Sequence, residues 1–376
     1  MVSRGPEKVR QFTPNWFTIT MGTGILSLSL NQFPVHVPGL HAIAIVLWML
    51  NIFLFSIFSV VYVARWILFT QEAKRIFSHS TVSMFFGAIP MGLATIINGF
   101  LVYGVPMWGA SIVSLARPLW WIDVVLALCS GIWIPFLMFT RQEHSLERMT
   151  AIWLLPIVAA EVSAASGAVL APFLNANLAL RILLISYGLW AFSVPLALSI
   201  LTILLLRLIV HKLPPNDMAA TGWLALGPIG TGVLGLISLG SDATHILPMA
   251  KFAEIAQVAF GIGLIGSIVL LGYGVFWLAM AILMTARYIR HGMPFNLGWW
   301  GFTFPLGVYA VAILAVARAT HIGTLFLIGG VLVVALTVLW ISVAIRTLQG
   351  AWTGSLFHSP CLMYGSIPED RVVGPS

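Results

Sequence analysis

Charge and cysteine are what this sequence has least of. Charged residues make up only 8% of the 376-residue chain, while 60% of its residues are hydrophobic. A soluble domain cannot cover its surface with so little charge, so the composition excludes a soluble globular protein and indicates a polytopic membrane protein. The two cysteines, Cys129 in an apolar span and Cys361 in the C-terminal tail, provide neither a disulfide framework nor a metal site.

The sequence also lacks the motifs of membrane enzymes. It has no Walker loop, no Cys/His cluster and no aspartate-rich pair of the kind that holds metal and diphosphate in membrane prenyl-transferring enzymes. Its nine histidines are scattered, and four of them (His36, His41, His245 and His321) lie near predicted loops. We therefore expect no catalytic residue, no metal and no cofactor. A membrane enzyme is the weakest alternative, since it would have to show activity in detergent without any ion gradient.

No polar stretch is long enough to form a second folded domain. We predict an N-terminal tail over residues 1–13, one transmembrane domain over residues 14–349 and a C-terminal tail over residues 350–376. The first apolar segment lacks a small-residue cleavage site, so we interpret it as a retained span rather than a signal peptide. Hydropathy predicts ten spans, near residues 14–31, 40–68, 81–103, 118–139, 149–171, 178–209, 220–240, 256–286, 297–317 and 322–346.

One kind of segment recurs five times, an apolar stretch with an aromatic residue, a proline and glycines. It occurs as Trp223–Gly230, Trp300–Gly307 and Phe85–Gly92, more loosely around Pro156, and without the proline in Asn15–Gly24. Proline and glycine are tolerated in a membrane helix where the freed backbone groups find protein or water partners, so five such segments predict helix breaks along one shared polar or water-lined axis. The residues expected at these breaks and along the axis are Gly22, Thr23, Gly24, Pro90, Gly92, Pro156, Pro228, Gly230, Pro305 and Gly307.

The recurring segments all lie in odd-numbered spans. The even-numbered spans are mostly long and apolar all round, as expected of helices that face lipid. This alternation repeats at intervals of roughly 70 residues, which is typical of an internal repeat. We therefore predict an all-α fold of ten transmembrane helices arranged as five hairpins, with the odd-numbered helices as an inner ring around a pore and the even-numbered helices as an outer ring.

The basic residues are distributed unequally between the two sets of loops. Only Arg117, Arg181, Lys251 and Arg318 of the 18 lysines and arginines belong to one set, where we expect them to form the outer mouth of the path. The positive-inside rule then places both termini in the cytoplasm, and we expect the chain to reside in the cell membrane. The net charge of +7 follows from this topology and gives no reason to expect a nucleic-acid partner.

Ionisable residues are rare within the odd-numbered spans. Glu161 is the one ionisable residue at depth, and it is either a proton-binding or gating group in the path or a structural hydrogen-bond partner. We expect Asp123 to be structural and to reach the interface near Arg117, while Asp242 lies at the outer end of its span. Without lysine or arginine, an anion in this path would meet backbone N–H groups and the hydroxyls of Thr18, Thr20, Thr23 and Thr303, which suits weak binding and rapid passage of a small anion.

Three stretches carry a resemblance to a known family that covers nearly the whole chain. Phe12–Ile25, Leu271–Leu278 and Phe295–Gly307 resemble the tellurite-resistance/dicarboxylate transporter family, and within it the sulfite efflux pumps and malic acid permeases; the plant slow anion channels are more distant relatives. The resemblance implies a homotrimer in which each protomer has its own pore. It also implies that a phenylalanine of the ninth helix closes the pore, and the matching residue is Phe304, with Phe302 as the alternative.

Two transport functions remain open on this basis. The first is a channel-like exporter of a small anion, with sulfite favoured by the resemblance. The second is a proton-coupled carrier of C4-dicarboxylates such as malate, with Glu161 as its proton site. The two differ in their expected dependence on pH, because only the carrier needs a group that takes up and releases a proton.

Overall fold

The structure is a computed structural model that describes residues 5–357 and residue 362, and all its regular elements are helices. Nine described helices are long and apolar enough to cross a membrane. The first predicted span, residues 14–31, is observed as a 3-10 turn at Pro14–Phe17 followed by α2 over Thr18–Asn31, and it is not one of these nine. The nine long helical segments are Leu40–Leu68 (α3), Val82–Trp108, Ala110–Thr140, Ala151–Phe173, Ala176–His211 (α9), Asn216–Met249, Ala253–His291 (α11), Leu297–Thr320 and Gly323–Thr353 (α13).

The composite segments consist of an α-helix joined to shorter helical turns. Their main α-helices are α5 (Ala88–Gly99), α7 (Val113–Thr140), α8 (Leu155–Leu170), α10 (Leu226–Met249) and α12 (Thr303–Thr320). A short helix, α1 (Gly5–Arg10), precedes the bundle, and its Arg10 forms an ion pair with Glu72.

Two classes of helix alternate along the chain. The apolar windows around α5, α8, α10 and α12 are 67–94% buried, whereas those of α3, α7, α9, α11 and α13 are only 22–39% buried. In α2 every residue except Asn31 is buried. The predicted alternation between covered odd-numbered and exposed even-numbered helices is therefore confirmed in the described part of the chain. We call α2, α5, α8, α10 and α12 the buried helices.

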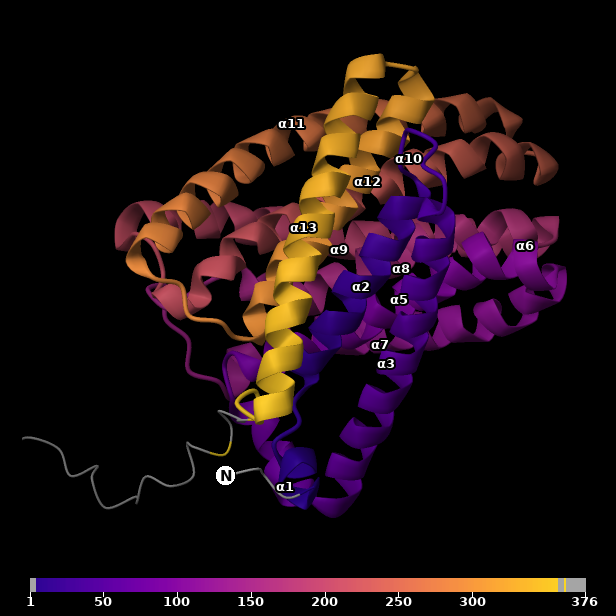
Figure 1. Ribbon diagram of the computed structural model, residues 1–376. Helices are drawn as coiled ribbons and strands as arrows, with labels where there is room; N and C mark the ends of the chain where they lie inside the picture. The colour runs from indigo at the N-terminus through magenta and orange to yellow at the C-terminus, as the bar shows by residue number, and fades with distance from the viewer. Residues whose placement is uncertain (1–4, 358–361, 363–376) are drawn as a thin grey trace, which may run out of the picture.

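The contacts among the buried helices run in sequence order and return to their start. α2 packs against α5, α5 against α8, α8 against α10, α10 against α12 and α12 against α2. The exposed helices pack against the buried helices, and α13, from the C-terminal part of the chain, lies beside α2 (Figure 1). The two ends of the transmembrane chain therefore meet.

Every buried helix begins with a 3-10 segment. These segments are Pro14–Phe17 (η1), Val82–Gly87 (η3), Ala151–Leu154 (η6), Asn216–Ala225 (η8) and Leu297–Phe302 (η9). We call the end of the molecule at which they lie the basic end, because most lysines and arginines belong to the loops there.

The recurring proline lies just after this 3-10 start. Pro90, Pro228 and Pro305 are each the third residue of their α-helix, and Pro156 is the second. Thr20 occupies the equivalent third position of α2. Proline is well tolerated in a first helical turn, where its missing N–H leaves no bond unmade. We expected these prolines to break their helices. In the described residues the irregular 3-10 backbone instead comes before each proline, and the α-helix continues after it.

The recurring glycines permit close approach of neighbouring buried helices. A Cβ atom on Gly230 of α10 would lie 2.7 Å from the backbone nitrogen of Tyr309 in α12, and one on Gly307 would lie 2.7 Å from Cγ1 of Ile25 in α2. A Cβ atom on Gly92 would overlap Thr20, and one on Gly22 would overlap Thr303. Small residues at such contacts are how membrane helices pack closely, so these glycines have a packing role in this fold.

Candidate functional site

Phe304 and Phe302 lie at the start of α12 in different surroundings. Both side chains are buried, with 3% and 2% of their surface exposed. The ring of Phe302 packs edge-on against Trp223 and Trp299, with ring centroids 5.7 and 5.8 Å apart. Phe304 has no such ring contact among the described residues. Phe302 is thus fixed in an aromatic cluster, while Phe304 is buried without a ring contact of this kind.

Glu161 lies deep in α8 and faces α10. Its side chain is fully buried, and Thr231 Oγ1 of α10 donates a hydrogen bond to its Oε1 at 2.5 Å. The other carboxyl oxygen, Oε2, has no hydrogen-bond partner among the described residues, and no salt bridge reaches Glu161 in that part of the chain. Glu161 is thus a buried carboxyl with an unused oxygen, in a helix that contains no lysine or arginine.

Asp123 lies elsewhere than we expected. It does not reach the interface near Arg117; its side chain is fully buried in α7 against α8, where Ser163 Oγ donates to Oδ2 at 2.6 Å. Nearby, Trp120 Nε1 donates to the backbone oxygen of Ser163 at 2.9 Å. Asp123 shares the buried stripe of α7 with Trp120 and Ala127, and this helical spacing is the signal by which the sequence could have placed it.

A polar cavity of about 570 Å³ opens at the end opposite the basic end. The last turns of α8 and α12 and the middle of α10 line it, with Ser238, Asp242, Arg318 and His321 among the polar groups. Arg318 also donates a hydrogen bond to Gln32, just after α2. Of the four basic residues expected at the outer mouth, Arg318 is the one that lines this cavity; the other three, Arg117, Arg181 and Lys251, are exposed at the same end but do not contribute to it.

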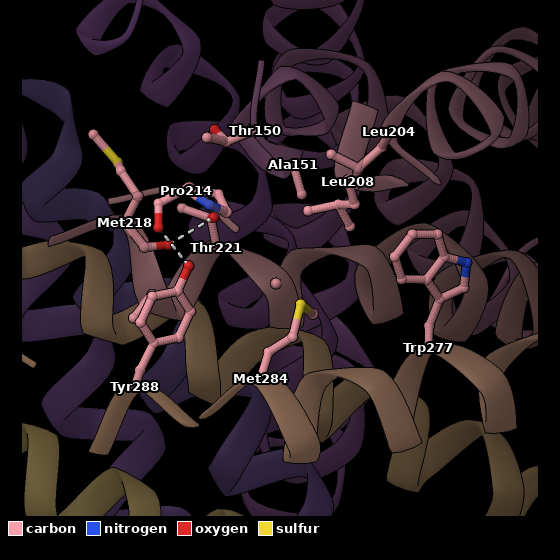
Figure 2. Close-up of a pocket in the computed structure, with 12 residues that line it drawn as sticks. Thr150, Ala151, Leu204, Leu208, Pro214, Met218, Thr221, Trp277, Met284 and Tyr288 are labelled. Atoms are coloured by element: carbon pink, nitrogen blue, oxygen red, sulfur yellow. Dashed lines mark hydrogen bonds between the residues drawn. The ribbon is translucent and has the colours of Figure 1, made fainter. Parts of the chain in front are cut away.

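Two further cavities differ in character from this mouth. An apolar groove of about 440 Å³ between α5 and α7 is lined by Pro90, Cys129 and Trp133 among others, so Pro90 borders an apolar surface. Figure 2 shows a much smaller space, of about 20 Å³, between α9, η8 and α11. There Tyr288 donates to the backbone oxygen of Pro214 at 2.7 Å. This space holds about one water molecule, so it is too small for a substrate.

The described residues contain no cluster of three or more His, Cys, Asp or Glu side chains that could hold a metal ion. The motif residues are therefore distributed among three kinds of place. The glycines lie at helix contacts, Glu161 and Phe304 lie in the interior, and Arg318 lies at the mouth.

Comparison with known proteins identifies relatives over almost the whole chain. The family model described as voltage-dependent anion channel matches residues 11–348. The chain is 38% identical to a sulfite efflux pump of Trichophyton rubrum, over 93% of each chain. It is 30% identical to an uncharacterized transporter of Methanocaldococcus jannaschii, over 93% of this chain and 96% of that one. It is 24% identical to a malic acid transport protein of Schizosaccharomyces pombe, over 89% of this chain and 77% of that one.

These matches confirm the family that the motifs of the sequence indicated, which is one of transporters and channels rather than enzymes. This chain is a membrane-embedded member of the voltage-dependent anion channel family.

Proposed function

We propose that this protein exports a small anion, with sulfite as the favoured substrate, along an axis enclosed by the five buried helices. The observation that carries the proposal is the closed order of contacts from α2 through α5, α8, α10 and α12 back to α2. Five helices in cyclic contact form a ring, and the exposed helices then form the outer layer. In this arrangement η1 and α2 together supply the tenth crossing.

The lining of this axis suits weak binding. The buried helices carry no lysine or arginine before Arg318, which lies near the end of α12 at the mouth. Hydroxyls in the first turns are engaged with their own backbone: Thr20 donates to the oxygen of Phe17 at 2.7 Å, and Thr303 donates to that of Trp300 at 2.7 Å. An anion that meets no fixed cation at depth leaves easily, and conduction requires such weak binding.

The identity of the anion rests on the relatives. The sulfite efflux pump of Trichophyton rubrum matches almost all of this chain, and at a higher identity than the malic acid transport protein. We place the basic end in the cytoplasm by the positive-inside rule, so that outward transport runs from the basic end to the cavity at Arg318. In this proposal the protein is a homotrimer in the cell membrane, and each protomer has its own path.

Phe304 closes the path in this proposal. It lies one residue before Pro305 in the first turn of α12 and is buried without a ring partner among the described residues. Its side chain can therefore swing aside without breaking an aromatic cluster, whereas movement of Phe302 would disrupt its contacts with Trp223 and Trp299.

A second candidate is favoured by Glu161. A buried carboxyl bonded to Thr231 between two buried helices could carry a proton during the cycle of a C4-dicarboxylate carrier. The malic acid transport protein of Schizosaccharomyces pombe is compatible with this alternative.

Flux into liposomes decides between the two. Purified protein is reconstituted, and uptake of sulfite, malate and chloride is compared at equal concentration, with protein-free liposomes as the control. We expect sulfite to enter faster than malate. Uptake of malate without sulfite would favour the carrier and contradict the first proposal.

A further inference from the structure

A second polar cavity, of about 190 Å³, lies at the basic end. It is formed by the segment before η3 and by the segment that joins α7 to η6. Its polar lining consists of His79, Ser80, Thr81, Glu143, His144, Ser145, Arg148 and Thr150. This cavity is separate from the mouth at Arg318, and none of the residues that we assign to the anion path lines it.

Arg148 supplies the fixed positive charge of this cavity. Its Nε donates to Ser145 Oγ at 3.2 Å, which orients the guanidinium group. Glu143 lines the same cavity, yet Arg148 forms no ion pair within residues 5–357. The two terminal nitrogens of Arg148 are therefore available for a ligand, and the guanidinium fork suits an oxyanion.

His144 is held in place by a network from three segments. Its Nε2 lies 2.9 Å from Gln142 Oε1, and since an amide oxygen can only accept, Nε2 carries the hydrogen. Gln142 Nε2 in turn donates to the backbone oxygen of Phe77 at 2.9 Å and to Ser83 Oγ at 3.0 Å. The imidazole also packs edge-on against Trp153. The second ring nitrogen, Nδ1, becomes a further donor when the ring is protonated.

Backbone hydrogen bonds hold the two segments that form the cavity. Thr81 and Thr150 immediately precede η3 and η6, which continue into α5 and α8. Nδ1 of His79 accepts from the N–H groups of Thr81 and Val82 at 3.1 and 3.2 Å, which fixes the segment before η3. Two helical segments thus begin beside Arg148, and the side chain of Thr150 accepts from the N–H of Ile152 at the start of the second.

We propose that this cavity binds a small oxyanion of the sulfite and sulfate class, through Arg148, His144 and the neighbouring hydroxyls, and that it is the loading site for the transported anion. Its role in loading rests on the proposed function, whereas the binding itself does not. The volume exceeds that of several water molecules at ~30 Å³ each, so an oxyanion fits together with part of its hydration. Arg148 is the one fixed cation and Glu143 opposes it, so the affinity for the oxyanion is moderate. A loading site needs such an affinity because it must release its ligand.

The binding should depend on pH. Burial lowers the pKa of His79, and burial together with Arg148 lowers the pKa of His144, so both rings are mainly neutral at neutral pH. As the pH falls through the lowered pKa of His144, its ring gains positive charge facing Arg148 and Glu143, and anion binding tightens. His79 stays neutral while its Nδ1 accepts from Thr81 and Val82. Sulfate is a suitable probe because its own charge stays constant between mildly acidic and neutral pH.

The test is calorimetric titration of the full-length protein in detergent with sulfate and with sulfite. Arg148→Gln should weaken binding at least about tenfold, as expected when a charge-assisted hydrogen bond is lost. Arg141→Gln is the matched control, because Arg141 lies in the same connecting segment but does not line the cavity. Glu143→Gln should tighten binding. Equal affinities of Arg148→Gln and wild type, at unchanged melting temperature, would overturn the site.

The loading role is tested by flux. With sulfite supplied at the basic end, Arg148→Gln should raise the apparent KM about tenfold while the maximal rate stays near that of wild type. Weaker binding without a change in KM would overturn the loading role. If the wild-type protein binds sulfate as expected but moves no sulfite, the proposed function fails and the site stands.

Discussion

α8 and α12 begin in the same way but present different chemistry to α10, which packs between them. Both have a 3-10 start followed by proline in the first α-helical turn. On one side, Thr231 of α10 donates to Glu161 of α8. On the other, Gly230 leaves α10 so close to α12 that a Cβ atom would lie 2.7 Å from the backbone of Tyr309.

The difference shows how one repeated pattern can serve separate tasks. The interface between α8 and α10 contains the buried carboxyl, whereas the interface between α10 and α12 depends on the absence of a side chain. Phe304, which we propose as the obstruction, lies in the first turn of α12. The polar group and the obstruction therefore lie on different helices and can be changed independently.

The largest effect should come from removing the obstruction on α12. Phe304→Ala should raise sulfite flux into liposomes several-fold, because the path then lacks its closing side chain. Phe302→Ala is the control, since it removes a ring fixed against Trp223 and Trp299 and should lower the melting temperature instead. Unchanged flux in Phe304→Ala, with normal folding, would rule out Phe304 as the gate.

A methyl group at the contact of α10 with α12 should cost stability. Gly230→Ala forces apart two backbones and should lower the free energy of unfolding by at least about 2 kcal/mol. Gly227→Ala, one helical turn earlier, is the matched control, because a Cβ atom there meets nothing within 4 Å. Thermal unfolding in detergent measures both, and equal melting temperatures would show that close packing is not what Gly230 provides.

A smaller loss of stability is expected from a substitution in α8. Ser163→Ala removes the hydroxyl that bonds Asp123 and leaves a buried carboxyl oxygen without that partner, at a cost of about 1–2 kcal/mol. Ser29→Ala removes a buried hydroxyl that bonds only the oxygen of Ile25 in its own helix, so it should cost less. If both variants unfold at the same temperature, the hydrogen bond to Asp123 contributes no more stability than a hydroxyl bond within one helix.

The smallest effect on rate is expected from Glu161→Gln, which keeps the shape and can still accept a hydrogen bond from Thr231. In an uncoupled anion path it should change sulfite flux only modestly at any pH. In a proton-coupled carrier it should abolish the response of uptake to a pH gradient. Loss of most sulfite flux in this variant would favour the proton-coupled carrier over the uncoupled anion path.

The sequence predicted the helices well because long apolar runs define them. The predicted span 178–209 is observed as Ala176–His211, and the alternation of buried and exposed helices followed from the glycine–proline motif of one set and the long, apolar character of the other. The first span, predicted over residues 14–31, is present as η1 and α2, although its α-helical part has only 14 residues and is rich in Gly, Thr and Ser.

What the sequence could not supply is the register between helices. Whether Gly230 lines a path or touches Tyr309 depends on how α10 and α12 are rotated against each other, and no single-chain pattern fixes that rotation. Asp123 has the kind of structural contact that we expected, but its location was predicted wrongly for the same reason, since its nearness to Arg117 in sequence said nothing about Ser163 on α8. His79 and His144 come together only because neighbouring hairpins pack side by side.

The most direct test of the central claim is the uptake of sulfite and malate by liposomes that contain the wild-type protein, with and without an imposed pH gradient. A weakly binding path for small anions predicts that sulfite enters faster than malate, and that the gradient changes sulfite uptake little once the protonation of sulfite itself is taken into account. Malate uptake that requires the gradient, with no uptake of sulfite, would contradict it.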